Sequence, residues 1–207
     1  LMPLVGAVRA NAAPRIDWRV QLLQRDRVLA LVRPDSNQKA SFCYYRHGKG
    51  WQREGYQAAC VLLRDVEYKK TVRMDPKLID CLYLIQGWLR AKGKPYVIHI
   101  LSGYRTSAHN RKLEREGAAK NSLHMRAMAA DIRIPGVSAR DIAQLAKAIG
   151  VGGVGIYPSK GFIHVDTGDK RSWVAQEFSD STDVEWFASA SMDWESNLWS
   201  EFDQLVA

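Results

Sequence analysis

Two short segments of the chain concentrate side chains that bind metal ions in proteins. The first carries His124 and Asp131, and the second carries His164 and Asp166. Two imidazoles and one carboxylate, from His124, Asp131 and His164, form a three-ligand set that leaves a fourth zinc position open for water, as catalytic sites do. His and Asp are common residues, so their types alone leave open whether these segments bind a metal.

The spacing of these residues indicates which elements must position them. The seven-residue gap between His124 and Asp131 suits a loop that runs into a strand, which is predicted at 129–134. His164 would then come from a neighbouring strand, predicted at 162–167. A metal site therefore requires these two strands to lie close together.

Apolar periodicity and turn residues predict the remaining elements. Asp75-Pro76 is a helix start, with Asp as the cap and Pro in the first turn, and Ser138 opens a helix in a pattern close to a capping box. Turn residues at 34–37 and 158–161, and a glycine-rich segment at 150–155, separate other elements. The predicted helices cover 52–66, 76–93, 105–116 and 138–149, and the predicted strands cover 27–32, 39–46, 96–101, 129–134, 155–157 and 162–167.

The order of these elements is mixed and shows no regular alternation of strand and helix. With 207 residues, the chain is long enough for one large domain or two small ones, and no internal repeat or long linker divides it. We therefore expect an α+β fold, a single domain with a central, mostly antiparallel sheet flanked by helices.

Positive charge is concentrated before residue 174. The chain has 30 Lys and Arg against 22 Asp and Glu, for a net charge of +8. Eight of the acids and none of the Lys and Arg lie in 174–207, so residues 1–173 carry 30 cations against 14 acids, or +16. A body this basic favours an anionic partner, either nucleic acid, an acidic membrane surface or an anionic cell-wall polymer, although the charge could also serve only solubility.

The two ends of the chain carry separate predictions. Residues 1–13 contain a short apolar run that ends in the small-x-small sequence Ala10-Asn11-Ala12. We expect this segment to be the remnant of an export signal, with a floppy apolar arm as the alternative. Residues 174–207 form an acidic extension with three tryptophans. We expect it to form short helices that pack on the basic body, with a disordered tail as the alternative.

Cysteine and hydropathy patterns exclude several classes of protein. The three cysteines, Cys43, Cys60 and Cys81, are too few for a disulfide scaffold and form no Cys-x-x-Cys pair for a zinc knuckle. Cys60 and Cys81 fall in apolar helical patterns and are predicted core residues. The chain has no run of about eighteen apolar residues, so no complete transmembrane helix is expected.

Four motifs occur in an order that indicates a family. They are Ile-Leu-Ser-Gly-Tyr-Arg at 100–105, Ala-Lys-Asn-Ser-Leu-His at 119–124, Gly-Gly-Val-Gly-Ile-Tyr-Pro at 152–158 and Phe-Ile-His-Val-Asp-Thr-Gly at 162–168. With these motifs the chain resembles the MepK (YcbK)-like periplasmic murein endopeptidases. Residues 122–131 also resemble the SxHxxGxAxD signature of the wider LAS, VanX and hedgehog-type zinc peptidase superfamily. The likeness covers 27–173, which we expect to be the zinc peptidase domain.

The resemblance implies a hedgehog- or DD-peptidase-like fold, one Zn²⁺ ion and a set of site residues. His124, Asp131 and His164 would ligate the zinc. Arg105 would stabilise the oxyanion that forms when water attacks the scissile carbonyl, unless it is a loop arginine paired with a carboxylate. Ser122 would hydrogen bond within the site and orient it, or would only cap a turn.

Several positions depart from the family pattern. Ala127 stands where the signature has Gly, and we expect little harm if its φ is negative, whereas a left-handed backbone would be strained. The usual general base is absent, because Gly161 stands where VanX-type relatives have Glu and Phe162 where other relatives have His. Asp166 is the substitute that the sequence offers, since on a strand it shares a face with His164. It could accept the proton of the zinc-bound water, or it could fix an imidazole as a supporting carboxylate.

Three further side chains are candidates for contact with substrate or for support of the site. They are Tyr104, Tyr157 and His109. His109 follows the Ser-Gly-Tyr-Arg motif on a predicted helix and could line the cleft. Tyr157 lies close to the last metal-binding strand, where packing is an equal alternative.

These observations lead to one leading function and one alternative. We expect an exported zinc metallopeptidase of the bacterial periplasm or cell envelope that hydrolyses peptide cross-links of peptidoglycan, with peptide stems as its partners. Cross-links between two diaminopimelate residues and between D-Ala and diaminopimelate are both open. The alternative is a non-catalytic, zinc-containing cell-wall binding module, which the missing base supports. Nucleic-acid binding rests on charge alone and is not expected.

Overall fold

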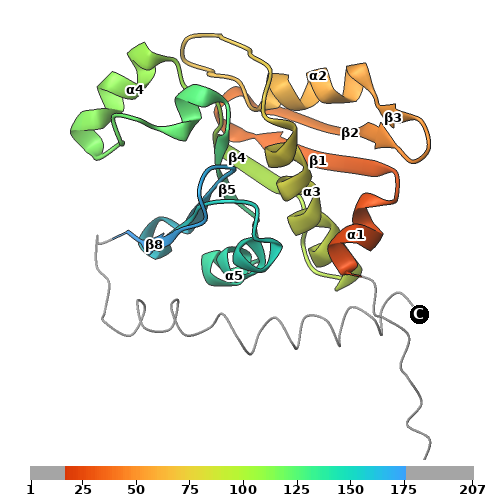
Figure 1. Ribbon diagram of the computed structural model, residues 1–207. Helices are drawn as coiled ribbons and strands as arrows, with labels where there is room; N and C mark the ends of the chain where they lie inside the picture. The colour runs from red at the N-terminus through yellow and green to blue at the C-terminus, as the bar shows by residue number, and fades with distance from the viewer. Residues whose placement is uncertain (1–16, 176–207) are drawn as a thin grey trace, which may run out of the picture.

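An eight-stranded sheet runs through the part of the chain that the computed structural model describes, residues 17–175 (Figure 1). The strands are β1 (Arg27–Arg33), β2 (Gln38–Arg46), β3 (Gly50–Trp51), β4 (Ile98–Ser102), β5 (Ala129–Arg133), β6 (Val154–Tyr157), β7 (Phe162–Asp166) and β8 (Ser172–Val174). Their order across the sheet is β3-β2-β1-β4-β5-β7-β6-β8. Among these strands only the β1–β4 and β6–β8 pairs are parallel. The predicted α+β fold with a mostly antiparallel sheet is confirmed.

Five α-helices accompany the sheet in the described residues. They are α1 (Trp18–Leu23), α2 (Arg53–Leu62), α3 (Pro76–Ala91), α4 (Ser107–Leu113) and α5 (Ala139–Ile149), and the short 3-10 turns are η1 (Pro34–Ser36), η2 (Glu114–Glu116), η3 (Leu123–Arg126) and η4 (Pro158–Lys160). α2 packs on β2, α5 packs on β6 and β7, and α3 contacts α1, α5 and β1. One cluster of buried apolar side chains joins these elements, so the described residues share a single core.

Side-chain caps begin two of the longer helices. The Asp75 carboxylate accepts a hydrogen bond from the backbone N–H of Lys77 at 2.9 Å. The Ser138 hydroxyl accepts one from the backbone N–H of Asp141 at 3.1 Å. Each cap satisfies a donor that has no partner within its helix. Both predicted helix starts are confirmed.

Two predicted helices are shorter in the structure because side-chain hydrogen bonds of Asp65 and Thr106 replace helical ones at their ends. α2 ends at Leu62, and Asp65 leaves the helical path to accept hydrogen bonds from the N–H and the hydroxyl of Thr106, at 2.8 and 3.0 Å. α4 begins at Ser107 because Thr106 caps it. Residues 63–66 and 105–106, which the sequence places in helices, therefore lie outside them, in two loops that the Asp65–Thr106 hydrogen bonds hold together.

Several strand predictions also differ from the structure, and the two-residue β3 is absent from the predicted strands. The strand predicted from Tyr96 begins at Ile98, because the carbonyl of Tyr96 accepts a hydrogen bond from the Gln86 side chain at 2.7 Å and not from a strand. β8 is absent from the predicted strands. Its three residues are too few to show the alternation by which a strand is recognised in a sequence.

The structure tests the predictions for the cysteines but not those for the ends of the chain. Cys60 and Cys81 are buried and unpaired, which confirms their predicted core positions. None of the described helices is long and apolar enough to cross a membrane. The predicted export remnant at 1–13 lies outside the described residues, as does the acidic extension apart from its first two residues, of which Val174 closes β8.

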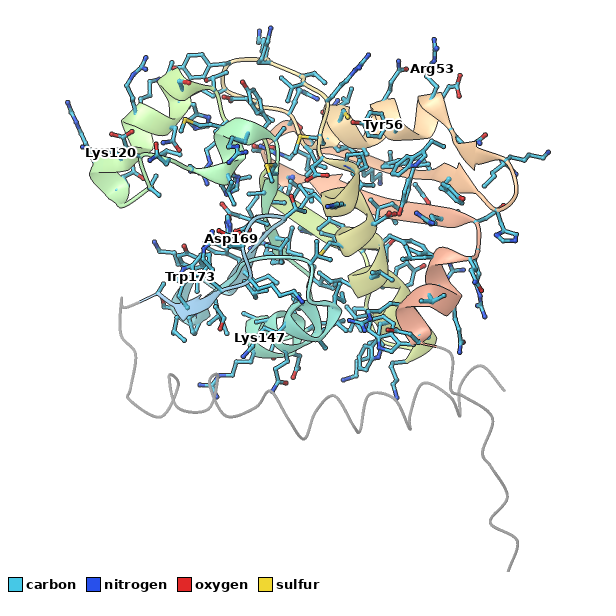
Figure 2. All side chains as sticks on the ribbon, in the orientation of Figure 1. Arg53, Tyr56, Lys120, Lys147, Asp169 and Trp173 are labelled. Atoms are coloured by element: carbon cyan, nitrogen blue, oxygen red, sulfur yellow. The ribbon has the colours of Figure 1, made fainter. Side chains whose placement is uncertain are left out.

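Basic side chains are spread over the surface of the described residues. Figure 2 shows Arg53 on α2, Lys120 after η2 and Lys147 on α5 at well separated positions. Such a distribution attracts anions in general and marks no single binding surface.

Gly55 in α2 packs directly on the backbone of β2, and its substitution tests this contact. A Cβ at this position would lie 2.0 Å from the carbonyl oxygen of Cys43. We expect Gly55→Ala to lower the free energy of unfolding by about 3 kcal/mol because the helix must move off the sheet, although Ala is the better helix former. Chemical denaturation measures the change.

Gly87→Ala in α3 is the matched control. Its Cβ would meet only the flexible side chain of Leu22, at 3.0 Å. We expect it to change the free energy of unfolding by less than about 1 kcal/mol. Equal losses in the two variants would contradict the packing argument.

Candidate metal centre

One row of paired residues across the sheet carries the candidate site. Asp131 on β5 pairs with Ser102 on β4 and with His164 on β7. Gly155 on β6 pairs in turn with His164 and with Trp173 on β8. Paired residues point to the same face of a sheet and lie about 5 Å apart. The register therefore brings Asp131 and His164 together, on the two neighbouring strands that a metal site requires.

His124 reaches the same place from the turn that precedes β5. It lies in η3, where the Ser122 hydroxyl accepts a hydrogen bond from the backbone N–H of His124 at 3.3 Å and caps the turn. The ring Nδ1 lies 2.6 Å from the carbonyl oxygen of Gly103, which can only accept a hydrogen bond. Nδ1 therefore carries the proton, and Nε2 presents its lone pair to the site.

Three potential ligand atoms converge at the centre of the site. His124 Nε2, Asp131 Oδ1 and His164 Nδ1 lie 2.9–3.3 Å from one another. A tetrahedral ion with bonds of about 2.0–2.1 Å holds its ligands about 3.3 Å apart. The three atoms already have nearly this spacing, and they form the one group of this kind among the described residues.

The protonation pattern of the cluster fits a metal ion. His164 Nε2 donates to the Asp166 carboxylate, 3.0 Å away, so the lone pair of Nδ1 faces Asp131 and His124. Two imidazole lone pairs and a carboxylate oxygen repel one another unless a cation lies between them. A proton can take that place: burial opposes it, but hydrogen bonds to Asp131 and Asp166 raise the pKa of His164 above its ordinary value. The donor set suits a divalent ion that imidazole and carboxylate bind.

Asp166 lies behind His164 and is enclosed by hydrogen-bond donors. Its Oδ1 accepts from the N–H groups of Gly153 and Gly168, at 3.0 and 2.9 Å. Its Oδ2 accepts from Arg171 Nη2 at 2.8 Å as well as from His164. Burial opposes ionisation, but these hydrogen bonds prevail and lower the pKa of Asp166 well below its ordinary value. Such a carboxylate is a weak proton acceptor and a strong orienting partner for an imidazole.

Arg105 holds the outer oxygen of Asp131. Its Nη2 donates to Asp131 Oδ2 at 3.3 Å, and its Nε donates to the Ser102 hydroxyl at 3.1 Å. Its backbone N–H donates to the carbonyl of His124 at 3.2 Å. The Ser-Gly-Tyr-Arg motif and the turn that carries His124 are thus one hydrogen-bonded unit, and Arg105 is both paired with a carboxylate and placed beside the cluster.

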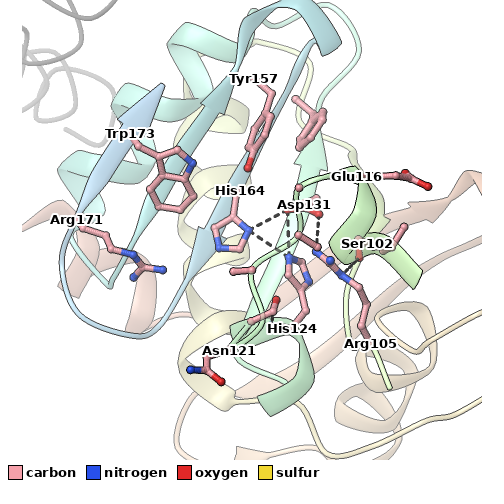
Figure 3. Close-up of a pocket in the computed structure, with 16 residues that line it drawn as sticks. Ser102, Arg105, Glu116, Asn121, His124, Asp131, Tyr157, His164, Arg171 and Trp173 are labelled. Carbon is pink, nitrogen blue, oxygen red and sulfur yellow. Dashed lines mark hydrogen bonds and ion pairs between the residues drawn. The ribbon is translucent and has the colours of Figure 1, made fainter. Parts of the chain in front are cut away.

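A pocket of about 570 Å³ is lined by the three candidate ligands and by Arg105 and Ser102 (Figure 3). The three candidate ligands lie at its centre, with Arg105 on one side and Trp173 and Arg171 on the other (Figure 3). A pocket of this size accommodates part of an organic substrate in addition to an ion.

The structure brings some of the predicted site residues together and places others elsewhere. Tyr157 lines the pocket, and its ring stacks on that of Phe162 with centroids 4.4 Å apart. Tyr104 packs against the hydrophobic core. His109 Nδ1 lies 3.0 Å from the Asp65 carboxylate. Neither Tyr104 nor His109 lines the pocket, so the predicted position of His109 in the cleft is wrong: its side chain turns toward the loop after α2.

Ala127 has a left-handed backbone, with a φ of 58°. The condition for little harm at this position, a negative φ, is therefore not met, and the strained alternative applies. Its N–H donates to the carbonyl of His124 at 3.2 Å, so this conformation closes the turn that carries a candidate ligand. A residue other than Gly there costs about 1–2 kcal/mol.

Arg171 and Trp173 stand in the pocket wall and are absent from the predicted site residues. A Cβ on Gly153 would lie 2.6 Å from Arg171 Nη1, and one on Gly155 would lie 2.4 Å from the indole of Trp173. The glycine-rich segment, which in the sequence indicates only a break between elements, leaves the space that these two side chains fill. A Gly-x-Gly segment that pairs with an Arg-x-Trp segment is the sequence signal of this wall.

The sequence is similar to those of known peptidoglycan endopeptidases. Residues 22–173 match the family described as peptidoglycan L,D-endopeptidase MepK. Peptidoglycan L,D-endopeptidase MepK of Escherichia coli strain K12 is 34% identical over 173 residues, which cover 82% of this chain and 93% of the relative. The probable peptidoglycan L,D-endopeptidase MepK of Haemophilus influenzae is 40% identical over 114 residues, which cover 54% of this chain and 60% of the relative. The matched family segment contains all the pocket residues described above.

Removal of one candidate ligand tests the metal site. We expect His124→Ala to weaken binding of a divalent metal by at least about 100-fold, beyond the 10–100-fold that loss of a supporting hydrogen bond costs. Calorimetric titration of the metal-free protein measures the dissociation constant. His109→Gln is the control and should bind as the unaltered protein does, since its side chain lies outside the pocket. Equal affinities for all three proteins would refute the assignment.

Proposed function

Because the chain belongs to the family of peptidoglycan L,D-endopeptidases described as MepK, we propose that it is a zinc-dependent hydrolase of peptide cross-links in bacterial peptidoglycan. One observation carries the zinc mechanism: the lone pairs of His124, Asp131 and His164 converge in a pocket that also contains Arg105. Three protein ligands with an open position beside them are the arrangement of catalytic zinc sites.

His124, Asp131 and His164 would hold the ion. When bound, zinc supplies a Lewis acid that polarises the scissile carbonyl and makes water a stronger nucleophile. The protein contributes the orientation of its ligands: Gly103 accepts the proton of His124, and Ser122 caps the turn that carries this histidine. Such supporting contacts hold each ring in the tautomer that ligation needs.

Arg105 would bind the oxygen of the scissile carbonyl as negative charge develops on it. The guanidinium is fixed by Ser102 and by the outer oxygen of Asp131, so it need not reorganise during the reaction. Preorganised donors of this kind stabilise a transition state more than a ground state. We therefore assign Arg105 a catalytic role.

Asp166 would orient His164. Its carboxylate accepts the Nε2 proton of His164 and keeps Nδ1 free for the ion. Its other lone pairs are taken by two backbone N–H groups and by Arg171. This environment favours the supporting role over that of a proton acceptor in the cleft.

The specificity in the names of the relatives favours one of the two cross-links. Both relatives described above are named as L,D-endopeptidases, so we propose that this chain cleaves the bond between the carbonyl of an L-centre and the amine of a D-centre. The cross-link that joins two diaminopimelate residues contains such a bond. The cross-link between D-Ala and diaminopimelate joins two D-centres and is the poorer substrate under this proposal.

Export follows from the same proposal. A peptidoglycan hydrolase must reach the cell wall, so we place its activity in the periplasm or cell envelope. The net charge of +16 over residues 1–173, from 30 cations and 14 acids, suits a wall whose peptide stems carry carboxylates.

A non-catalytic zinc-containing binding module is the second candidate. Gly161 and Phe162 occupy the positions at which resembling peptidases carry their base. Phe162 lines the pocket and presents an aromatic ring where those relatives have an imidazole. A protein of this kind would bind zinc and cell-wall peptides and release no product.

Product analysis separates these two functions. We expect the zinc-loaded protein to convert purified cross-linked muropeptides to monomers whose masses identify an L,D-bond, and His124→Ala to convert none. Mass spectrometry measures both reactions. Zinc binding with no cleavage of any cross-link would reject the peptidase and favour the binding module.

Asp166→Asn separates the two roles of this carboxylate. Asn keeps the shape of the side chain but loses its charge. If Asp166 orients His164, zinc affinity falls about 10–100-fold, and cleavage of muropeptides recovers as zinc is raised. Cleavage that stays absent at saturating zinc, with zinc affinity unchanged, would instead make Asp166 the proton acceptor.

Arg105→Gln tests the assignment of the oxyanion contact. We expect kcat to fall by about 10²–10³-fold, as for loss of one preorganised donor, while KM changes by less than about threefold. Steady-state kinetics at saturating zinc measure both constants, with zinc affinity determined in parallel because Arg105 also contacts Asp131. A raised KM with an unchanged kcat would show that Arg105 binds the ground state and the transition state equally, which would contradict the oxyanion assignment.

A further inference from the structure

The pocket wall opposite Arg105 is a built structure that the proposed mechanism does not use. Trp173 on β8 and His164 on β7 are separated by β6, yet their ring centroids lie only 5.3 Å apart. The indole reaches across Gly155, where a Cβ would lie 2.4 Å from it. Absence of a side chain at this one position therefore lets Trp173 stand beside a candidate ligand.

Arg171 is fixed against this wall. Its Nη2 and Nη1 donate to the two oxygens of Asp166, at 2.8 and 3.3 Å, and Nη1 also donates to the carbonyl of Asp169 at 3.0 Å. Its guanidinium carbon lies 5.2 Å from the centre of the Trp173 ring. Gly153 leaves room for it, since a Cβ there would lie 2.6 Å from Nη1. These contacts hold the guanidinium in one orientation.

Arg171 keeps hydrogen-bond donors for a ligand. A guanidinium has five N–H groups, and its contacts with the described residues use both hydrogens of Nη1 and one of Nη2. The Nε hydrogen and the second Nη2 hydrogen remain. The side chain is 46% exposed and lines the pocket, and Figure 3 shows its guanidinium directed toward His164. A fixed, half-exposed guanidinium with two such donors is suited to bind a carboxylate.

The position of Arg171 relates this carboxylate to the reaction. Arg171 Nη2 and His164 Nε2 contact the same oxygen of Asp166, at 2.8 and 3.0 Å. A single carboxylate oxygen therefore bridges the guanidinium and the imidazole. Arg105, the other cation among the described residues of this pocket, is largely buried and engaged with Ser102 and Asp131. Arg171 is therefore the more exposed of the two cations that line the described pocket, and Arg105 keeps its proposed contact with the scissile carbonyl.

We propose that Arg171, with Trp173 beside it, forms a subsite for the free carboxylate on the leaving side of the scissile bond. This inference rests on the proposed function. In an L,D-bond between two diaminopimelate residues, the carbon that carries the leaving nitrogen also carries an unmodified carboxylate. Arg171 binds this group, and the indole of Trp173 packs against the aliphatic chain of the same residue. The substrate class is L,D-linked peptides with a free carboxylate at the leaving residue, and amidation of that carboxylate makes them poor substrates.

Two substrates that differ only in this group test the subsite. They are L,D-linked muropeptide dimers in which the leaving carboxylate is either free or amidated. We expect kcat/KM of the zinc-loaded protein to be about 10–100-fold higher for the free carboxylate, the range for a hydrogen bond to a charged group. Arg171→Gln should remove this preference, chiefly by raising KM for the free carboxylate, and should bring kcat/KM for the two dimers to within about threefold of each other.

Two further variants control for charge and shape. Arg171→Lys keeps the charge but not the planar fork of donors, so we expect it to recover only part of the preference. Lys170→Gln removes an exposed neighbouring charge that does not line the pocket, and it should keep the preference of the unaltered protein. Loss of the preference in Lys170→Gln as well would overturn the subsite in favour of a general charge effect.

Arg171 also contacts Asp166, and the experiment must separate a role through His164 from a role in binding. In the former case Arg171→Gln lowers kcat for both dimers equally and weakens zinc binding about 10–100-fold, which would overturn the proposal. Calorimetric titration with the two leaving products, free and amidated, provides a readout without catalysis. We expect Arg171→Gln to weaken binding of the free product alone, by about tenfold or more.

The calorimetric arm also keeps the two proposals distinguishable. If the unaltered protein binds both products equally, the subsite is refuted whatever the enzyme cleaves. If it discriminates between the products but cleaves neither dimer, the subsite is supported, and the proposed hydrolase fails.

Discussion

The register of the central sheet is the constraint on which the candidate site depends. One row across β4, β5, β7, β6 and β8 contains two potential ligands, the hydroxyl that holds Arg105, and the indole of the pocket wall. The neighbouring residues along each strand point to the opposite face of the sheet. Ile132, next to Asp131, pairs there with Ile163, next to His164, and both are buried in the core. A slip of one residue between β5 and β7 would expose that apolar pair and turn His164 away from Asp131. Packing of the core thus enforces the geometry of the polar face.

Each potential ligand is oriented by a partner outside the cluster. A backbone carbonyl accepts the proton of His124, a buried carboxylate accepts that of His164, and Arg105 takes the outer oxygen of Asp131. The remaining lone pairs face one another at the centre of the pocket. Without a cation between them, these lone pairs repel one another, and only the fold holds them together. The same repulsion favours a cation at the cluster, because little of the protein must reorganise to receive it.

Local sequence signals are sufficient for most of the elements and for the residues that converge. Caps at Asp75 and Ser138 place two helix starts, and the spacing of His124 and Asp131 places a turn before a strand. The surroundings of Asp166 have no local signal, because its donors arrive from β6, from the turn after β7 and from Arg171. Its two possible roles are therefore separable only in three dimensions. Ala127 shows the same limit, since closure of the turn, and not the preference of alanine, sets its left-handed backbone.

The wall formed by Arg171 and Trp173 comes from a different segment of the chain than the potential ligands, although it lies beside them. β8 is a three-residue strand at the edge of the sheet, whereas His124, Asp131 and His164 come from η3, β5 and β7. Under the two proposals, reaction and recognition fall to separate segments of the chain. In such an architecture, a substitution in the edge strand or in its facing glycines can change the shape and charge of the wall while the three potential ligands stay in place.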